Sequence, residues 1–296
     1  MKYLDYVEKN LPSLEGKKFL VTGANSGLGF SACKTFLMKG ASVIMACRNL
    51  ERANKAKENL LKIVPNGQID IVQFDQADKE SIDQLPKQLE KYEYIDAVVL
   101  NAGIFHPGKN LFTKQGYSLT VGTNFIGLYF AVQALKEMIE ERKIKRLVLV
   151  SSVVTHFGRS KHYERYFRKY HRSSFKQYSV SKRMIYEYGL YLSSALYGQT
   201  EVTLCHPGLA STNIVGGEAT SFSKRFQHLG KKFLHKFGNS ADKSSLCLVE
   251  ASIKSPANLG YFYPKHLFHI RGIPKEKRLH LNEKKYARLL KSLTHL

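Results

Sequence analysis

Two hydrophobic periods alternate along this chain of 296 residues. Short runs rich in valine, isoleucine and leucine are typical of buried strands. They are separated by longer segments in which apolar residues recur every three or four positions, as in amphipathic helices. Two of the runs fall within 17–49, and the others lie at 69–75, 94–103, 145–152 and 201–208. Strands that alternate with helices predict an α/β fold with a doubly wound parallel sheet and helices on both faces.

We expect a single domain over residues 1–296, because no repeat, low-complexity tract or linker rich in proline, glycine and serine divides the chain. The Rossmann-type core is expected at about 15–260, with ligands bound at the carboxyl ends of its strands. Two elaborations, 153–177 and 213–240, are expected to cover a pocket. The tail, 275–296, is expected to form a charged amphipathic helix packed on the domain.

Composition changes this picture mainly through charge. Hydrophobic residues at 43% and charged residues at 24% are ordinary for a globular protein and exclude disordered, fibrous and collagen-like classes. However, 46 Lys+Arg against 24 Asp+Glu give a formal net charge of +22. Such a field favours an anionic partner, which could be a phosphorylated cofactor, an anionic membrane surface or a nucleic acid.

The cysteines and the apolar runs suggest where the protein works. The four cysteines lie far apart without metal-ligand spacing, so we expect no metal site and no disulfide framework, and reduced thiols in a cytosolic chain. The start of the chain does not have the pattern of a secretory signal, and no run reaches the roughly 18 apolar residues of a membrane span. We therefore expect a cytoplasmic protein, with peripheral contact at an anionic membrane as a further possibility.

A glycine-rich turn follows the first predicted strand. In "TGANSGLG" the glycines let the chain turn tightly and let a pyrophosphate approach the backbone, while the next helix begins with free N–H groups. Strand, motif and helix together favour a dinucleotide site, and the alternative is an ordinary strand-to-helix turn. The cofactor-binding residues predicted in this turn are Gly23, Asn25, Ser26, Gly27, Leu28 and Gly29.

The ends of the next two strands bear on the choice of cofactor. The second strand ends in "ACRN", where a carboxylate would favour NAD. Arg48, followed by Asn49, is instead suited to a 2′-phosphate, so NADP(H) is favoured over NAD(H). The alternative for Arg48 is a solvated surface charge. Asp75 closes the third strand and could accept a hydrogen bond from the adenine amino group or cap the helix that follows.

Several further motifs occur in one order along the chain. They are TGxxxGxG at 22–29, "NAG" at 101–103, Asn124 in "TNFIGLYF", "VSS" at 150–152, "YSVSK" at 178–182 and "HPGLAST" at 206–212. In this order they resemble the short-chain dehydrogenase/reductase family over roughly residues 15–260. The "ACRN" and "HPG" details are most similar to the branch that contains retinol dehydrogenases and protochlorophyllide reductases.

The resemblance implies a role for each motif residue. Tyr178 would donate or accept the proton, Lys182 would activate it, Ser152 would bind the substrate oxygen, and Asn124 would be a relay residue holding an ordered water. Ser151 is a rival for the role of Ser152, and the family's serine is the second of such a pair. The other motifs imply further cofactor contacts. At the nicotinamide ribose the resemblance implies Asn101, Ala102 and Gly103, which could instead stabilise the sheet edge. At the carboxamide it implies Pro207, Gly208 and Thr212.

Elementary electrostatics supports the pairing of Tyr178 with Lys182. Positions four apart share one face of a helix. Ionising a phenol near pH 7 requires a pKa about 3 units lower, or roughly 4 kcal/mol. One ammonium about 4 Å away, at an effective dielectric constant near 20, supplies about 4 kcal/mol. We therefore expect the lysine to lower the pKa of the tyrosine.

Two segments bear on the substrate. Residues 153–177 separate Ser152 from Tyr178 and alternate aromatic with basic side chains, so they should loop out over the mouth of the site, as a pocket wall or a solvated excursion. Residues 221–237 have the spacing of a basic amphipathic helix, which would cover an apolar substrate and contact anionic lipid, or pack on the core or an oligomer partner.

These features predict an oxidoreductase that transfers hydride between NADP(H) and a hydrophobic carbonyl or alcohol substrate. The alternative is a protein that binds NADP(H) as a sensor or scaffold without turnover. No motif for specific nucleic-acid binding is present. The resemblance also implies a homo-oligomer, either a dimer or a tetramer.

Overall fold

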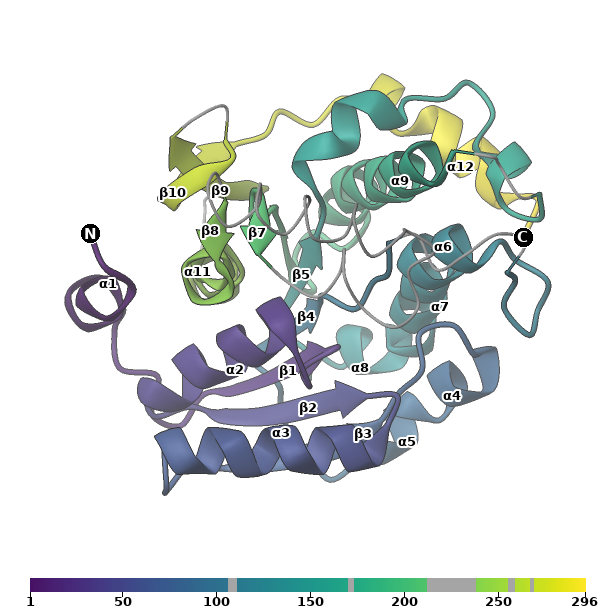
Figure 1. Cartoon of the computed structure of the whole chain (residues 1–296). Helices are drawn as coiled ribbons and strands as arrows, with labels where there is room; N and C mark the ends of the chain where they lie inside the picture. Colours follow the sequence, from purple (N-terminus) through teal and green to yellow (C-terminus); the bar gives the residue numbers. More distant parts are fainter. Residues whose placement is uncertain (106–110, 170–172, 212–237, 255–258, 267–268) are drawn as a thin grey trace, which may run out of the picture.

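The computed structural model describes residues 1–105, 111–169, 173–211, 238–254, 259–266 and 269–296. Its centre is an eight-stranded sheet in the order β10-β9-β6-β5-β4-β1-β2-β3 (Figure 1). The strands are β1 (Lys18–Thr22), β2 (Ser42–Cys47), β3 (Ile69–Gln73), β4 (Ala97–Leu100), β5 (Arg146–Val150), β6 (Glu201–Cys205), β9 (Gly260–His266) and β10 (Arg271–Arg278). All neighbouring pairs are parallel except β9 with β10. The predicted doubly wound parallel sheet is confirmed.

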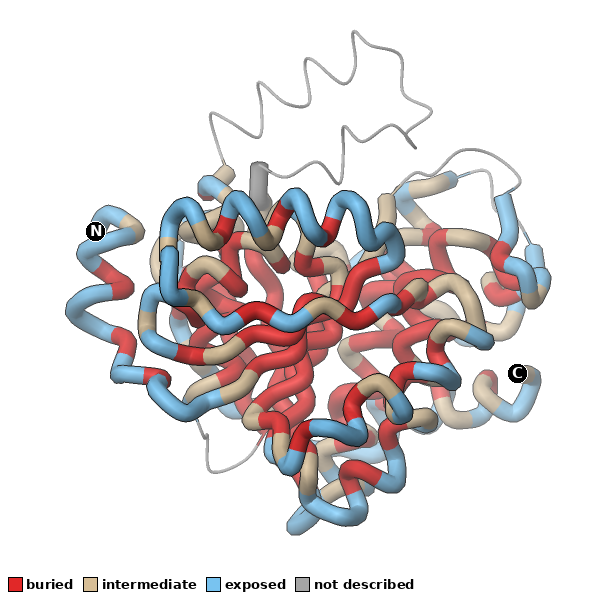
Figure 2. Tube along the Cα trace, turned by 90° about the horizontal axis from the view of Figure 1, so that it is seen from below, coloured by how far each residue is buried: buried red, intermediate tan, exposed pale blue. Residues whose placement is uncertain are grey.

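Helices cover both faces of this sheet. On one face lie α1 (Tyr3–Asn10), α2 (Gly27–Met38), α3 (Leu50–Ile63) and α11 (Ala241–Ile253). The other face carries α4 (Lys79–Asp83), α5 (Leu85–Leu89), α6 (Leu119–Val121), α7 (Gly127–Ala134), α8 (Lys136–Glu140), α9 (Ser174–Ala195) and α12 (Ala287–Leu293). Buried residues concentrate in the strands and on the inner sides of the helices (Figure 2).

The strands supply two separate cores because their side chains alternate in direction. In β5, Leu147 and Leu149 belong to the core under α7 and α9, whereas Val148 and Val150 belong to the core under α2 and α11. The continuous apolar run "RLVLV" is therefore explained by burial on both faces.

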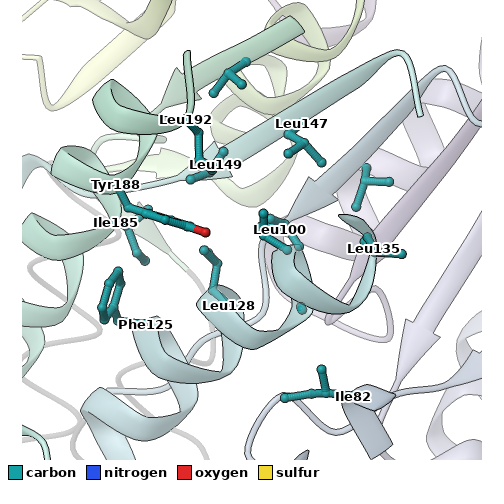
Figure 3. Close-up of a cluster of buried hydrophobic side chains, with 14 of the residues drawn as sticks. Ile82, Leu100, Phe125, Leu128, Leu135, Leu147, Leu149, Ile185, Tyr188 and Leu192 are labelled. Carbon is teal, nitrogen blue, oxygen red and sulfur yellow. The ribbon is translucent and has the colours of Figure 1, made fainter. Parts of the chain in front are cut away.

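Leu128 of α7 and Tyr188 and Leu192 of α9 lie in one core with Leu147 and Leu149 of β5 (Figure 3). Phe125, in the π-helical turn just before α7, meets the ring of Tyr188 edge to face, with centroids 6.0 Å apart, a contact worth about 1 kcal/mol beyond its buried area. A side chain at Gly189 would lie 2.7 Å from Leu204 of β6, so only glycine lets α9 approach the strand this closely.

The elaboration at 153–177 differs from the expected loop. Its described part forms the 3-10 helices η2 (Val153–Gly158) and η3 (Tyr163–Tyr166), and Tyr163 and Phe167 are buried in the core beneath α9. This part therefore packs against the body of the protein and is not a solvated excursion, and its role as a cover of the substrate pocket stays a prediction. Residues 221–237, with the predicted amphipathic helix, lie outside the described residues.

The C-terminal region also differs from the prediction. A helix was expected over 275–296, but Lys275–Arg278 end strand β10, and a short 3-10 helix at Glu283–Lys285 precedes α12. Only Ala287–Leu293 form an α-helix, which packs on the domain through Leu289. A small parallel ladder, β7 (Ala210–Ser211) with β8 (Asn239–Ser240), stands apart from the main sheet.

No helix within the described ranges is both long and apolar enough to cross a bilayer.

Candidate active site

The predicted site residues that the structure describes gather at the carboxyl edge of the sheet. The glycine-rich turn follows β1, Arg48 follows β2 and Asp75 follows β3. The "NAG" turn follows β4, the two serines follow β5, and Pro207 and Gly208 follow β6. Thr212 lies outside the described residues. Because the strand order reverses at β1, next to β4, this is the switch point at which open α/β sheets bind ligands.

The turn after β1 packs closely against the start of α2. A side chain at Gly29 would stand 2.4 Å from the Gly23 carbonyl oxygen and 2.9 Å from Asn101 Nδ2, so no larger residue fits. Ser26, the N-cap of α2, makes no side-chain capping bond, whereas Asn49 caps α3 and Ser173 caps α9. The first N–H groups of α2 therefore have no side-chain cap and can bind an anion.

Asn101 joins the ends of two strands. Its Nδ2 donates to the Thr22 carbonyl at 2.9 Å, and the amides of Asn101 and Ala102 both donate to Thr22 Oγ1 at 2.9 Å. This geometry agrees with the interpretation that the "NAG" turn stabilises the sheet edge, and it leaves a role for the turn at the nicotinamide ribose as a prediction.

Arg48 and Asp75 lie next to each other at the ends of β2 and β3. Arg48 Nε is 4.0 Å from Asp75 Oδ2, and the arginine side chain is 72% exposed. Asp75 Oδ1 accepts a hydrogen bond from the Ala77 amide at 2.9 Å. The cap of α4 is Asp78, so the interpretation of Asp75 as that helix cap is wrong. Asn49 is occupied as the cap of α3, at 2.8 Å from the Arg52 amide.

The candidate catalytic pair lies in the second and third turns of α9. Lys182 Nζ is 5.8 Å from the centre of the Tyr178 ring and donates to the Val150 carbonyl at 2.9 Å. The hydroxyl of Ser152 hydrogen-bonds the Tyr178 side chain. Ser151 points elsewhere and donates to the Lys182 carbonyl at 2.9 Å. The structure therefore brings Ser152, Tyr178 and Lys182 together, and Ser151 attaches α9 to the strand.

The charge states of this pair differ from the expectation. Burial raises the pKa of Tyr178 to about 12, although the hydrogen bond from Ser152 opposes the rise. Burial also lowers the pKa of Lys182 to about 8. The cost of dehydrating a charge therefore exceeds the attraction between the two groups when the pair stands alone. At pH 7 the phenol holds its proton and the lysine is mostly charged.

Asn124 lies in a π-helical turn, η1 (Gly122–Ile126), and is fully buried. Its Oδ1 accepts from the Ile104 amide at 2.7 Å, and its Nδ2 donates to the Ile104 carbonyl at 2.9 Å and to Ser181 Oγ at 3.1 Å. A π-turn often marks a functional site. Here it aims the amide at the backbone beyond the "NAG" turn, so Asn124 positions that backbone. Its role as a water relay stays a prediction.

Gly103 lies between the groups just described. A side chain there would stand 3.2 Å from Asn124 Oδ1 and 3.6 Å from Lys182 Nζ. The predicted motifs after β4, in η1 and in α9 therefore meet at one point.

Sequence reasoning missed Gln76, which follows Asp75. Its Nε2 donates to the carbonyls of Ala102 at 3.1 Å and Thr123 at 2.8 Å, which joins the end of β3 to the "NAG" turn and to η1. Its Oε1 is buried without a hydrogen-bond partner among the described groups. Its position directly after a strand was the one available signal.

Phe105 and His206 were also missed. The Phe105 ring meets Tyr178 edge-on, with centroids 5.0 Å apart and planes at 76°. His206 Nδ1 accepts from the Gly208 amide at 3.2 Å, and burial lowers the pKa of the imidazole to about 3. The histidine is therefore neutral at pH 7 and shapes the turn that carries Pro207 and Gly208.

The arrangement fits a nicotinamide dinucleotide. The uncapped start of α2 suits a pyrophosphate, and Gly29 lets this helix pack closely on the turn that precedes it. Arg48 lies at one end of the strand edge, and the Ser152, Tyr178 and Lys182 cluster lies farther along it. These features define an α/β protein with a dinucleotide-type site beside a buried, protonated phenol.

Comparison with known proteins identifies the family. The sequence model described as short chain dehydrogenase matches residues 17–220, and the chain belongs to this family. It is 30% identical over 213 residues to retinol dehydrogenase 14 of Mus musculus, with 68% of this chain and 63% of the relative covered. It is 34% identical over 140 residues to the WW domain-containing oxidoreductase of Gallus gallus, with 47% and 34% covered. The matches thus span between a third and two thirds of these relatives.

Solved structures share the fold. A putative uncharacterized protein from Mycobacterium Paratuberculosis superposes with a TM-score of 0.68 and 22% identity, with 97% of this chain and 95% of that one covered. Levodione reductase superposes with a TM-score of 0.65 and 18% identity, with 81% and 91% covered. A short chain dehydrogenase from Shigella flexneri, complexed with NADP, has a TM-score of 0.60 and 21% identity, with 81% and 92% covered.

Proposed function

We propose that this chain is an NADP(H)-dependent oxidoreductase that interconverts a hydrophobic carbonyl compound and its alcohol, with Tyr178 as the general acid and base. The observation that carries the proposal is the convergence of Ser152, Tyr178 and Lys182 beside the turn of Gly103. Family membership and the NADP complex of one structural relative support it.

In this proposal each residue acts on the substrate oxygen or on its neighbour. Ser152 and Tyr178 present two hydroxyls to the carbonyl oxygen and so orient it. When bound, the reduced nicotinamide supplies hydride to the carbonyl carbon. Tyr178 holds the proton that the developing alkoxide needs, and its raised pKa keeps that proton available at pH 7. Lys182, mostly charged at that pH, stabilises the phenolate that remains.

We propose NADP(H) over NAD(H) because Arg48 follows β2, and a guanidinium at the end of this strand is suited to a 2′-phosphate. The Arg48 guanidinium is largely exposed, and its Nε lies 4.0 Å from Asp75 Oδ2. At this distance the carboxylate orients the arginine, and the guanidinium can still bind a phosphate. The proposed contacts of Asn25, Ser26, Gly27 and Leu28 with the pyrophosphate, and of Pro207 and Gly208 with the carboxamide, follow from their places at the strand edge.

The proposed substrate is apolar. Phe105 covers one side of Tyr178. Phe175, one turn before Tyr178 on α9, contacts Phe157 of η2 with ring centroids 5.8 Å apart, and both of these side chains are substantially exposed. Exposed aromatic rings beside the candidate site suit a hydrophobic substrate better than a sugar or a small polar acid. A cytoplasmic location, peripheral membrane contact, a homo-oligomeric state and the lack of a specific nucleic-acid partner remain proposals alongside it.

The test is oxidation of NADPH against a panel of hydrophobic aldehydes and ketones, with Tyr178→Phe beside the wild type. We expect the variant to lose about 10²- to 10⁴-fold in kcat, the usual contribution of a positioned proton donor, while it still binds NADPH in calorimetry. Tyr186→Phe removes a hydroxyl two turns further along the same helix and should retain activity.

Equal rates in wild type and Tyr178→Phe would contradict the role of the phenol. Tight NADPH binding without turnover on any member of the panel would favour the alternative, a sensor or scaffold that keeps the fold.

A further inference from the structure

A cavity of about 690 Å³ lies at the edge of the sheet opposite the candidate active site, and we call it the basal cavity. It is formed by the turn before β5, the end of α9, the start of β6 and the segment after β10. Thr200 to Thr203 line it, whereas Pro207 and Gly208 follow the other end of β6. A five-residue strand is about 17 Å long, so the two sites are separate.

The basal cavity has a substantial apolar wall. Val202, Leu259 and Leu279 line it, and Tyr197 and Leu281 contribute large side chains that are 87% and 49% exposed. Its volume is in the range of small-molecule sites and is far larger than a packing defect. An apolar body of about two fused rings would cover side chains that otherwise face water.

Among the charged side chains that line the cavity, one cation has no carboxylate partner in the described part of the chain. Lys145 Nζ lies 3.0 Å from Asp96 Oδ1, a carboxylate that it shares with Lys17, and Glu201 forms an ion pair with Arg146. Arg142 also lines the cavity, is exposed and has no carboxylate within salt-bridge distance in the described part of the chain. A guanidinium of this kind binds a carboxylate through two parallel hydrogen bonds.

Arg142 also has an unusual backbone. Its φ is 58°, in the left-handed region, and its amide donates to the Ile139 carbonyl at 3.0 Å just beyond the end of α8. Glycine is the usual residue at such a helix end, because a side chain there is strained. A strained arginine at the rim of a cavity is a reason to look for a ligand.

We propose that the basal cavity binds a small apolar carboxylate, with its hydrophobic body on Tyr197, Leu279 and Leu281 and its carboxylate on Arg142. The proposal is independent of the oxidoreductase function, because none of these residues belongs to the candidate active site. It assigns the protein a second ligand site, reached from the opposite side of the sheet.

The probe is 1-naphthylacetate, compared with its uncharged isostere 1-naphthylacetamide, titrated calorimetrically into the full chain. We expect the carboxylate to bind at least about tenfold more tightly than the amide, as one charge-assisted contact provides. Arg142→Ala should remove that preference. Lys62→Ala, which removes an exposed cation of α3, and Tyr178→Phe should leave it unchanged.

Arg142→Gly separates folding from binding. Glycine relieves the strain at this φ, so the variant should have a higher urea midpoint than the wild type and yet lose the carboxylate preference. No measurable binding of the carboxylate, equal affinity for the amide, unchanged binding in Arg142→Ala, or competition by NADPH would each overturn the proposal. A failure of Tyr178→Phe to lose turnover would affect only the proposed function.

Discussion

Tyr178 and Lys182 show how burial and charge compete at single side chains. An ammonium about 4 Å from a phenol would lower its pKa substantially, but burial is the largest influence on both side chains, and Lys182 Nζ donates to the Val150 carbonyl. Both groups therefore shift toward their neutral forms. A sequence gives the spacing of two residues on a helix, whereas the rotamer and the dehydration that decide their charges depend on the packed strand ends.

The lowered pKa of Lys182 should appear in the pH dependence of stability. The folded chain releases this proton near pH 8, while the unfolded chain holds it until about 10.5. Over that window the unfolded state binds more protons, so the free energy of unfolding should rise with pH by up to a few kcal/mol. Urea titrations of wild type and Lys182→Met at pH 7 and pH 10 measure this effect. The free energy of unfolding of the wild type, relative to that of the variant, should be larger at pH 10. A constant difference would contradict the burial of a charged lysine.

Arg48 should control the choice between the two nicotinamide cofactors. Arg48→Ala removes the one described guanidinium beside Asp75 at the ends of β2 and β3. We expect the ratio of NADPH to NADH affinity to fall about tenfold or more, the value of a charge-assisted phosphate contact, with NADH binding unchanged or slightly weaker. Calorimetry with both cofactors measures the ratio. Arg271→Ala, which removes another exposed arginine, is the control, and an unchanged ratio in Arg48→Ala would remove the phosphate assignment.

Among the elements, α9 connects the candidate site with the elaboration at 153–177. Its first turns carry Tyr178 and Lys182, and its next turn carries the buried Glu187. Glu187 Oε1 accepts hydrogen bonds from Tyr163 Oη at 3.0 Å and Arg183 Nε at 2.6 Å. We call these three residues the Glu187 cluster. It fixes η3 to the side of α9, which is why this segment does not extend into solvent.

Breaking the Glu187 cluster should lower the free energy of unfolding by more than the loss of single hydrogen bonds would. Glu187→Ala leaves the half-buried Arg183 without its carboxylate and Tyr163 without its acceptor, and should destabilise the fold by about 3 kcal/mol. Tyr163→Phe should cost about 1 kcal/mol, and adding it to Glu187→Ala should cost less than that because the acceptor has already gone. Urea denaturation of the four proteins completes the cycle, and strict additivity would show that Glu187 and Tyr163 do not interact.

Strands with a simple apolar pattern were predictable, and the last two strands were not. β1, β2, β4, β5 and β6 are short buried runs, whose pattern follows from burial on both faces, whereas β3 is an edge strand with Asp70 and Gln73 exposed. β9 and β10 instead contain Pro264 and Pro274, which face each other in the ladder, and β10 ends in a run of charged residues. Proline and charge are tolerated there because β10 is an antiparallel edge strand, a position that local sequence does not reveal.

For the molecule as a whole, the predictable part of the site is the part encoded by contiguous motifs. The glycine-rich turn, "NAG", the serine pair and YxxxK all lie at one edge of the sheet, as the topology requires. Gln76 has no motif, because its contacts with Ala102 and Thr123 exist only once three elements are folded together. The basal cavity was likewise invisible, since it is formed by segments from four distant parts of the chain.

The net charge of +22 should appear as salt-dependent binding to anionic surfaces. We expect co-sedimentation with vesicles containing phosphatidylserine at 20 mM salt and its loss at 500 mM, because surface attraction is screened within a few ångströms at high ionic strength. Replacing Phe157 and Phe175 by serine should weaken the binding further, since these exposed rings flank the candidate site.

Neutral phosphatidylcholine vesicles are the control for charge. Equal binding to neutral and anionic vesicles would contradict the electrostatic origin, and stronger salt-dependent retention on DNA than on vesicles would favour a nucleic-acid partner.

The adjacent serines after β5 explain how a long insertion and a fixed reaction geometry coexist. Ser151 donates a hydrogen bond to the Lys182 carbonyl, and Ser152 hydrogen-bonds the Tyr178 side chain. Lys182 Nζ donates to the Val150 carbonyl. These three hydrogen bonds set the spacing of the Ser152 and Tyr178 hydroxyls. The length of the chain between the two residues does not set it. A segment of different length can therefore be grafted between the strand and the helix to alter what the site accepts, provided that it keeps Tyr163 and Phe167, which are buried in the core.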